Sequence, residues 1–190
     1  MIINRDICSY NIGLDENRGA KIVYFGDSVF LPPDQKDEAL YLKWIGRESY
    51  IDPQYKKTTK VKRESDVYGF GVILFEILCG RLAYDPIYLK ESEEGLAHVA
   101  RLSFSTGLLE ELIDPIIKEE IGENNFVLER GPNKDSLHRF ITIAHQCVAE
   151  TQDQRPTMKV VVNELEKALL FQVSHCSNFI IWIPISKIVC

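Results

Sequence analysis

Residues 67–79 are apolar almost throughout and carry a single charged residue, Glu76. A helix without a polar face has no side to present to water, so it has to lie in the middle of a domain. Ser65 or Asp66 is a suitable N-cap, and Gly80 can adopt the left-handed conformation that often follows a helix. The chain therefore needs other elements that surround this central segment.

Most of the remaining apolar patterns predict helices. Apolar residues recur at helical spacing over residues 137–148 and 158–169, which predicts two amphipathic helices that each pack one face onto a core. Residues 94–118 predict two more helices, which are broken near Gly107 and closed by Asp114-Pro115. These helices can enclose the central segment.

The N-terminal end shows a different pattern. Two short apolar runs, at residues 11–14 and 21–25, enclose Asn17 and Gly19, and this combination predicts a β-hairpin. Residues 27–55 show little periodicity and predict a long loop, a kind of segment that is often functional in compact domains. Because no strand pattern returns after the hairpin, the expected fold class is mainly α with a small β-hairpin at the N-terminal end.

Length and composition restrict the function further. A chain of 190 residues has room for one ordinary domain, and its formal net charge of −6 argues against nucleic-acid binding through overall positive charge. No run approaches the ~18–20 apolar residues of a membrane span. The five cysteines are far apart and include no Cys-x-x-Cys pair, which argues against a zinc site and favours reduced thiols in the cytoplasm.

Five short motifs carry most of the chemical information. In chain order they are Asn4-Arg5-Asp6-Ile7-Cys8-Ser9-Tyr10-Asn11, Tyr24-Phe25-Gly26, Asp52-Pro53-Gln54, Ser65-Asp66 and Asp153-Gln154-Arg155-Pro156-Thr157-Met158. Their order and spacing resemble the signature set of the protein kinases, namely the catalytic loop, the Asp-Phe-Gly motif, the end of the activation segment and the central helix. The third and fifth motifs are similar to those of the plant receptor-like kinases.

The resemblance covers about residues 2–170 and implies the carboxy-terminal lobe of a protein kinase, a helical bundle around a buried central helix. Residues 1–172 are then expected to form a partial kinase domain, and residues 173–190 an apolar tail outside the core. In the family, a lobe with a Gly-rich loop and a strand lysine precedes the catalytic loop. The 190 residues contain neither feature.

The resemblance also assigns roles to single residues. Asp6 stands where the family has the aspartate that accepts the substrate hydroxyl proton, and Asn11 where it has an amide that holds magnesium. Cys8 replaces the lysine that meets the γ-phosphate, and Tyr24 replaces the aspartate that chelates magnesium. Since Mg²⁺ prefers carboxylate oxygen, a neutral phenol is a poor substitute.

Other matched positions are structural in the family. Arg5 stands where an arginine pairs with a phosphorylated activation-segment residue, and Asp66 where an aspartate caps the backbone of the catalytic loop. Gln54 replaces a glutamate that forms a buried ion pair with the arginine at position 155, which predicts that Arg155 lacks its usual counter-charge. Arg47 also departs from the family's activation segment, where threonine is usual.

These replacements favour a degenerate relative of the plant receptor-like kinases that is catalytically inactive and acts, if at all, by binding another kinase or signalling protein. No cofactor is expected, and ATP and Mg²⁺ are implied only by the family. Two alternatives stay open: an ATP-dependent serine/threonine kinase of which this chain is a part, and a non-functional truncated gene product. The family implies a cytoplasmic location, at the plasma membrane if the chain belongs to a longer receptor.

Overall fold

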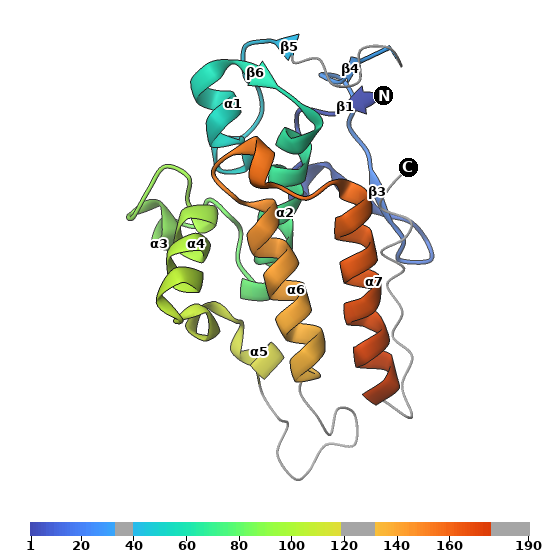
Figure 1. The fold of residues 1–190 in the computed structure, drawn as a ribbon, viewed down its shortest axis with the longest axis vertical. Coiled ribbons are helices and arrows are strands. Elements are labelled where there is room, and N and C mark those ends of the chain that lie inside the picture. Colours follow the sequence, from blue (N-terminus) through green and yellow to red (C-terminus); the bar gives the residue numbers. More distant parts are fainter. Residues whose placement is uncertain (33–39, 119–131, 176–190) are drawn as a thin grey trace.

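The computed structural model describes residues 1–32, 40–118 and 132–175, and its fold is mainly helical, as the sequence predicts (Figure 1). A central helix is surrounded by the other helices, and most of the short strands lie at one end of the molecule. The helices are α1 (Pro53–Thr58), α2 (Arg63–Cys79), α3 (Pro86–Leu89), α4 (Leu96–Thr106), α5 (Pro115–Lys118), α6 (Lys134–Cys147) and α7 (Met158–His175).

The strands form three antiparallel pairs of two or three residues each. The predicted hairpin is β2 (Ile12–Leu14) with β3 (Ala20–Ile22), in a register that places Ile12 opposite Ile22. The other two pairs are β1 (Ile2–Ile3) with β4 (Val29–Phe30), and β5 (Leu40–Tyr41) with β6 (Lys60–Val61). The expectation that no strand follows the hairpin is therefore wrong, because isolated two-residue pairs leave no detectable period-2 pattern.

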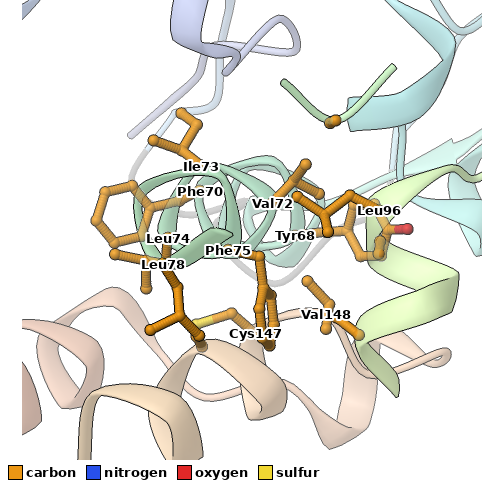
Figure 2. Close-up of a cluster of buried hydrophobic side chains, with 14 of the residues drawn as sticks. Tyr68, Phe70, Val72, Ile73, Leu74, Phe75, Leu78, Leu96, Cys147 and Val148 are labelled. Carbon is orange, nitrogen blue, oxygen red and sulfur yellow. The ribbon is translucent and has the colours of Figure 1, made fainter. Parts of the chain in front are cut away.

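Helix α2 forms the centre of the core. Tyr68 and Phe75 are completely buried, and Figure 2 shows their side chains among residues from α2, α4 and the end of α6. Close approach depends on glycine, since a Cβ at Gly71 would lie 2.6 Å from Cβ of Cys147. The missing side chain at this position therefore lets α2 and the end of α6 pack in direct contact.

The central segment is mostly buried, as predicted, but its charged residue is buried while one of its apolar residues is exposed. Glu76, its only charged residue, is buried, whereas Ile77 is 59% exposed. The Glu76 carboxylate accepts hydrogen bonds from the Tyr50 hydroxyl and from the Ala83 backbone N–H, the latter at 2.7 Å. A buried carboxylate is tolerated when it is hydrogen-bonded in this way.

The start of this helix also differs from the prediction. Helix α2 begins at Arg63, so Ser65 and Asp66 lie in its first turn and neither is the N-cap. Gly80 does end the helix in the left-handed conformation, with φ of 63°. The side chains of Ser65 and Asp66 instead contact other segments of the chain.

Two further boundaries are corrected. The segment predicted as a loop over residues 27–55 contains β4, a 3₁₀ turn at Glu48–Tyr50 and the start of α1, whose N-cap Asp52 accepts a bond from the Gln54 N–H. Asp114-Pro115 does not close a helix but starts α5, because Asp114 accepts a bond from the Ile116 N–H at 2.8 Å. Proline at the first helical position fits that role.

Helix α7 continues to His175, three residues beyond the predicted end of the domain. Near its end, Gln172 accepts a hydrogen bond from the Asn133 N–H at 2.8 Å and thus ties α7 to the start of α6. The rest of the predicted tail, residues 176–190, lies outside the described residues. Among the helices that are described, none has the length and apolar character needed to cross a bilayer.

Candidate functional site

The catalytic-loop motif is held directly on α2. The Asp66 carboxylate accepts the backbone N–H groups of Asn4 and Arg5 at 2.7 and 2.8 Å, as the kinase resemblance implies. Burial raises the pKa of Asp66 to about 6, although the two N–H donors and the charge of Arg5 act in the opposite direction. The group is therefore mostly ionised at pH 7 and can accept both bonds.

Replacing Asp66 by Asn is expected to destabilise the chain by about 1–3 kcal/mol, because one backbone N–H would face the amide NH₂ instead of an acceptor. Urea denaturation of both forms measures the change. Replacing the exposed Glu93 by Gln is the control for loss of one charge, since its side chain is 82% exposed. Equal stability of the Asp66→Asn variant and the wild type would contradict this role.

A second contact fixes the position of the loop on α2. A Cβ at Gly69 would lie 2.4 Å from the backbone oxygen of Ile7, so only glycine allows the loop to pass this close to the helix. Arg5 itself has φ of 73°, a left-handed conformation that its surroundings must hold in place. The Asp66 bonds and the close passage at Gly69 provide that restraint.

Asp6 and Asn11, to which the resemblance assigns the catalytic and a metal-binding position, lie together. The Asn11 Nδ2 donates to the Asp6 carboxylate at 2.8 Å and to the Asp6 backbone oxygen at 2.9 Å. This orientation directs the side-chain NH₂ of Asn11 to Asp6 and leaves its Oδ1 as the possible metal ligand. Gly46 of the activation segment passes close by, since a Cβ there would lie 2.5 Å from Asp6 Oδ1.

Tyr24 does not provide the ligand that magnesium needs. Its hydroxyl donates to the Asp27 carboxylate at 2.9 Å, and its side chain is 41% exposed. This hydrogen bond and the Asp27 charge raise the pKa of Tyr24, so the phenol keeps its proton at neutral pH. Because Mg²⁺ prefers anionic carboxylate oxygen, the residue at this position does not fit the metal that the kinase family uses.

Cys8 lies where the family has a lysine, and a different residue brings positive charge to it. The thiol is buried, and burial together with the nearby Asp6 charge raises its pKa, so it stays neutral. Arg47 Nη1 lies 3.6 Å from Cys8 Sγ, and its guanidinium lies over the Tyr10 ring at 3.9 Å from the centroid. The cation at this place thus comes from the activation segment and not from the catalytic loop.

Arg5 connects the catalytic loop to the activation segment. Its guanidinium donates to the Tyr55 hydroxyl at 3.1 and 3.3 Å and to the backbone oxygens of Asp27 and Lys43 at 3.1 and 2.8 Å. Its N–H groups are therefore directed at neutral acceptors.

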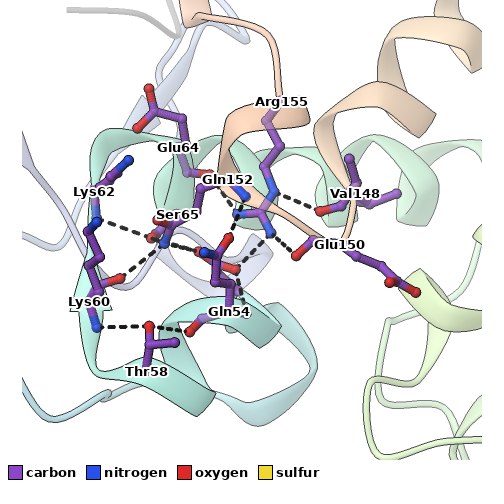
Figure 3. Close-up of polar contacts among 12 residues, drawn as sticks. Gln54, Thr58, Lys60, Lys62, Glu64, Ser65, Val148, Glu150, Gln152 and Arg155 are labelled. Atoms are coloured by element: carbon purple, nitrogen blue, oxygen red, sulfur yellow. Dashed lines mark hydrogen bonds and ion pairs between the residues drawn. The ribbon is translucent and has the colours of Figure 1, made fainter. Parts of the chain in front are cut away.

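The prediction that Arg155 lacks its counter-charge is wrong, because Asp52 supplies one. Figure 3 shows the Arg155 side chain beside Gln152 and Glu150. Arg155 Nη2 lies 2.7 Å from Asp52 Oδ1, and both side chains are completely buried. Gln54 contributes elsewhere: its Oε1 accepts the backbone N–H of Gln152 at 2.7 Å. Arg155 therefore does not lack its counter-charge, although position 54 is neutral.

The Asp52–Arg155 pair belongs to a larger buried network. The Asp52 carboxylate also accepts bonds from the Ser65 hydroxyl at 2.8 Å and from Gln152 Nε2 at 2.7 Å. The Arg155 guanidinium donates to backbone oxygens of Glu64, Ala149 and Glu150. The network joins the end of the activation segment to α2 and to the segment before α7.

Sequence reasoning missed three of these residues. Asp52 belongs to one of the five motifs, but it lies 103 positions from Arg155 in the sequence. No local pattern therefore reveals the pair. Arg47 is recognised only as a departure from the family. Asn4 is buried and donates to the Tyr24 backbone oxygen at 2.8 Å, which holds the first two motifs together.

Comparisons with known proteins agree with this geometry. A family model described as the protein kinase domain matches residues 1–165. A probable receptor-like protein kinase of Arabidopsis thaliana is 38% identical over 172 residues, which cover 90% of this chain and 19% of the relative. The receptor-like protein kinase FERONIA of the same plant is 36% identical over 178 residues, 93% of this chain and 18% of that protein.

A nodulation receptor kinase of Pisum sativum is also similar, with 34% identity over 173 residues, which are 90% of this chain and 17% of the relative. The chain therefore spans about a fifth of the length of these curated relatives. The family match and the arrangement of the catalytic loop on α2 lead to the same conclusion. The chain belongs to the protein kinase family, and the relatives it matches are plant receptor-like kinases.

Proposed function

We propose that this kinase-like chain does not transfer phosphate and acts by binding another protein of kinase signalling. The observation that carries the proposal is the side chain of Tyr24, a protonated phenol bonded to Asp27 at the position where the family binds magnesium. The buried neutral thiol of Cys8 supports it, since a thiol cannot replace an ammonium at a phosphate. Losing one preorganised electrostatic contact at an active site typically costs about 3 kcal/mol of transition-state stabilisation.

Exposed apolar side chains of the N-terminal segments are suited to a protein partner. They lie on the β2–β3 hairpin, directly after it and on β4. Leu14 and Phe30 are each 70% exposed, and Val23 is 61% exposed. Where such groups form a contiguous patch, they mark protein–protein contacts. A cytoplasmic location would give these side chains access to other kinases.

An active serine/threonine kinase remains the second candidate, and the Asp6–Asn11 pair favours it. These two side chains are in contact at 2.8 Å, at the positions that the resemblance assigns to the catalytic aspartate and to a metal ligand. On this reading, the chain supplies the carboxy-terminal lobe of a longer kinase. The two candidates differ in whether magnesium and ATP bind.

Adding ATP and magnesium is expected to leave the unfolding temperature of the chain unchanged at submillimolar nucleotide. A ligand present at 100 times its Kd would stabilise the folded state by ~2.7 kcal/mol, so thermal unfolding is a sensitive measurement. The Tyr24→Asp variant is the matched comparison, because it restores the carboxylate. We expect any magnesium-dependent rise in the unfolding temperature to be larger in this variant than in the wild type.

ATP without magnesium is the control for binding that does not use the metal. A magnesium-dependent rise in the unfolding temperature of the wild type would overturn the proposed loss of catalysis. Transfer of labelled phosphate to a protein substrate by the wild type, and not by an Asp6→Asn variant, would do so independently. Either result would favour the second candidate.

A further inference from the structure

We propose that a basic patch on β5, β6 and the end of α1 binds an acidic segment of a partner protein. The patch consists of Lys43, Lys57 and Lys60, with the ring of Tyr41 on the same face. The proposal deepens the proposed function, on which it rests, because it names the chemistry of the protein that the chain would bind.

Positive charge is concentrated in one short part of the chain. Residues 43–63 contain seven lysines and arginines and two acidic residues, a formal charge of +5. Because the whole chain carries −6, the other 169 residues carry −11. Both acidic residues of this part already have cationic partners, since Asp52 pairs with Arg155 and Glu48 with Lys56. The chain as a whole repels anions, so attraction of an acidic ligand requires a local reversal of charge of this kind.

The β5–β6 pair presents one face to solvent. Leu40 is paired with Val61, which is completely buried, and Tyr41 is paired with Lys60. Because successive side chains of a strand point to opposite faces, Tyr41 and Lys60 lie on the outer face, where Tyr41 is 71% exposed. Directly paired residues have Cβ atoms about 5 Å apart, so the Lys60 stem and the Tyr41 ring are neighbours.

Lys43 extends this outer face. The Leu42 N–H donates to the Thr59 backbone oxygen at 2.8 Å, which continues the pairing beyond β5. Leu42 packs against the buried cluster that includes Val61, so its side chain points inward. The next residue, Lys43, therefore points outward on the same side as Tyr41, and it is exposed.

The end of α1 brings Lys57 close to Lys60. Tyr55 of α1 is buried, and Lys57, about 200° further around the helix, is exposed. Thr59 ends the helix in the left-handed conformation, with φ of 59°. The Lys60 N–H donates to Thr58 Oγ1 at 3.2 Å, a contact that Figure 3 shows. This tight turn keeps the two lysines on one surface.

The three lysines of the patch have no counter-charge of their own. Among the residues that the structure describes, Lys43, Lys57 and Lys60 form no ion pair. By contrast, Lys56 and Lys62, at the margin of the patch, pair with carboxylates. Like charges that lie close together repel, and this repulsion is relieved when an anion binds among them. The side chains of an acidic segment supply such anions.

The margin of the patch favours a narrow ligand over a flat one. Glu93, which pairs with Lys56, is 82% exposed. Asp153, which pairs with Lys62, is 87% exposed. A membrane with anionic lipids would approach these exposed carboxylates as well and be repelled by them. An acidic segment of a protein can contact the three lysines of the patch without covering its margin.

Fluorescence anisotropy of the full chain with an acidic peptide tests the inference. The probe is a fluorescein-labelled peptide of four Ser-Glu-Glu repeats, and a peptide of four Ser-Gln-Gln repeats is its neutral control. We expect saturable binding of the acidic peptide alone. The affinity should fall about tenfold or more between about 50 and about 300 mM NaCl, because salt screens exposed charges.

The double variant Lys57→Gln/Lys60→Gln should bind the acidic peptide about fivefold more weakly or worse, since two exposed ion pairs are lost. The matched control, Lys21→Gln/Lys134→Gln, removes two charges elsewhere and should bind like the wild type. Lys21 lies on β3, and Lys134 begins α6 at the end of the molecule opposite β5 and β6 (Figure 1).

Far-UV circular dichroism establishes that each variant is folded, and Lys43→Gln replaces Lys60→Gln if the first double variant is not. Absence of peptide binding by the wild type would overturn the proposal. Equal weakening in the two double variants would also overturn it, because binding would then depend on net charge and not on the patch.

Two other occupants are outcomes of the same test. Co-sedimentation with phosphatidylserine vesicles that Lys57→Gln/Lys60→Gln abolishes would assign the patch to a membrane surface. Self-association at low salt that the same variant abolishes would assign it to a second copy of the chain. Either result contradicts the proposal. Neither changes the outcome of the ATP experiment, so failure of this proposal is distinguishable from failure of the proposed loss of catalysis.

Discussion

The Asp52→Asn variant is expected to lose about 3–5 kcal/mol of unfolding free energy, because it leaves a buried guanidinium without its counter-charge. Arg155 and Asp52 are fully buried and 2.7 Å apart, so neither group can be hydrated when its partner is removed. The substitution also weakens the bonds from Ser65 and from Gln152 that end on the same carboxylate. Urea denaturation of the wild type, Asp52→Asn, Arg155→Met and the double variant measures both the losses and the coupling.

Two controls separate this pair from ordinary surface charges. The Asp153→Asn variant removes an exposed ion pair between Lys62 and Asp153, in which Asp153 is 87% exposed. This change should lower the unfolding free energy by no more than ~1 kcal/mol. Gln54→Glu should change stability by less than about 1 kcal/mol, because Arg155 already has an anionic partner. A large gain from Gln54→Glu, together with no coupling between positions 52 and 155, would contradict the observed pairing.

The pH dependence of the unfolding free energy is a third measurement on the same pair. Burial alone would raise the pKa of Asp52, but the bond and charge of Arg155 and the bonds from Gln152 and Ser65 lower it below its usual value of 3.8. A lowered folded-state pKa contributes stability that is complete above the unfolded pKa and is lost as the pH falls through the folded one. The difference in unfolding free energy between the wild type and the Asp52→Asn variant should therefore decrease only under strongly acidic conditions.

The sequence predicts the parts of this molecule that depend on local patterns. The central helix, the two long amphipathic helices and the hairpin follow from apolar periodicity and turn residues. The order of the motifs also places Asp66 against the catalytic loop, and its bonds to Asn4 and Arg5 confirm that contact. In each case the decisive residues are close in sequence or belong to a recognisable motif.

The parts that could not be predicted depend on contacts between distant segments. A neutral residue at position 54 indicated an unpaired Arg155, yet Asp52, two positions earlier, supplies the charge because the N-terminus of α1 faces the segment before α7. The Arg47–Cys8 contact joins residues 39 positions apart, and neither residue type indicates the other. Periodicity also could not show that Glu76 points inward, since its acceptor role depends on Tyr50 and Ala83.

Replacing Phe75 by Ala is expected to cost about 3–5 kcal/mol, because the completely buried ring would leave a cavity at the centre of the core. Figure 2 shows Phe75 directed from α2 toward Cys147 at the end of α6. One turn earlier, Gly71 brings the same two helices so close that they cannot easily collapse further into the space. Urea denaturation followed by far-UV circular dichroism measures the loss.

The matched control lies on the same helix, two residues further along. Ile77 is 59% exposed, so the Ile77→Ala variant deletes apolar atoms that are in contact with solvent. It should change the unfolding free energy by no more than about 0.5 kcal/mol. The contrast between the two variants tests which face of α2 is buried, a question that its uniformly apolar sequence leaves open. Similar losses at both positions would mean that another segment covers Ile77, whereas a small loss at Phe75 would contradict the packing of α2 against α6.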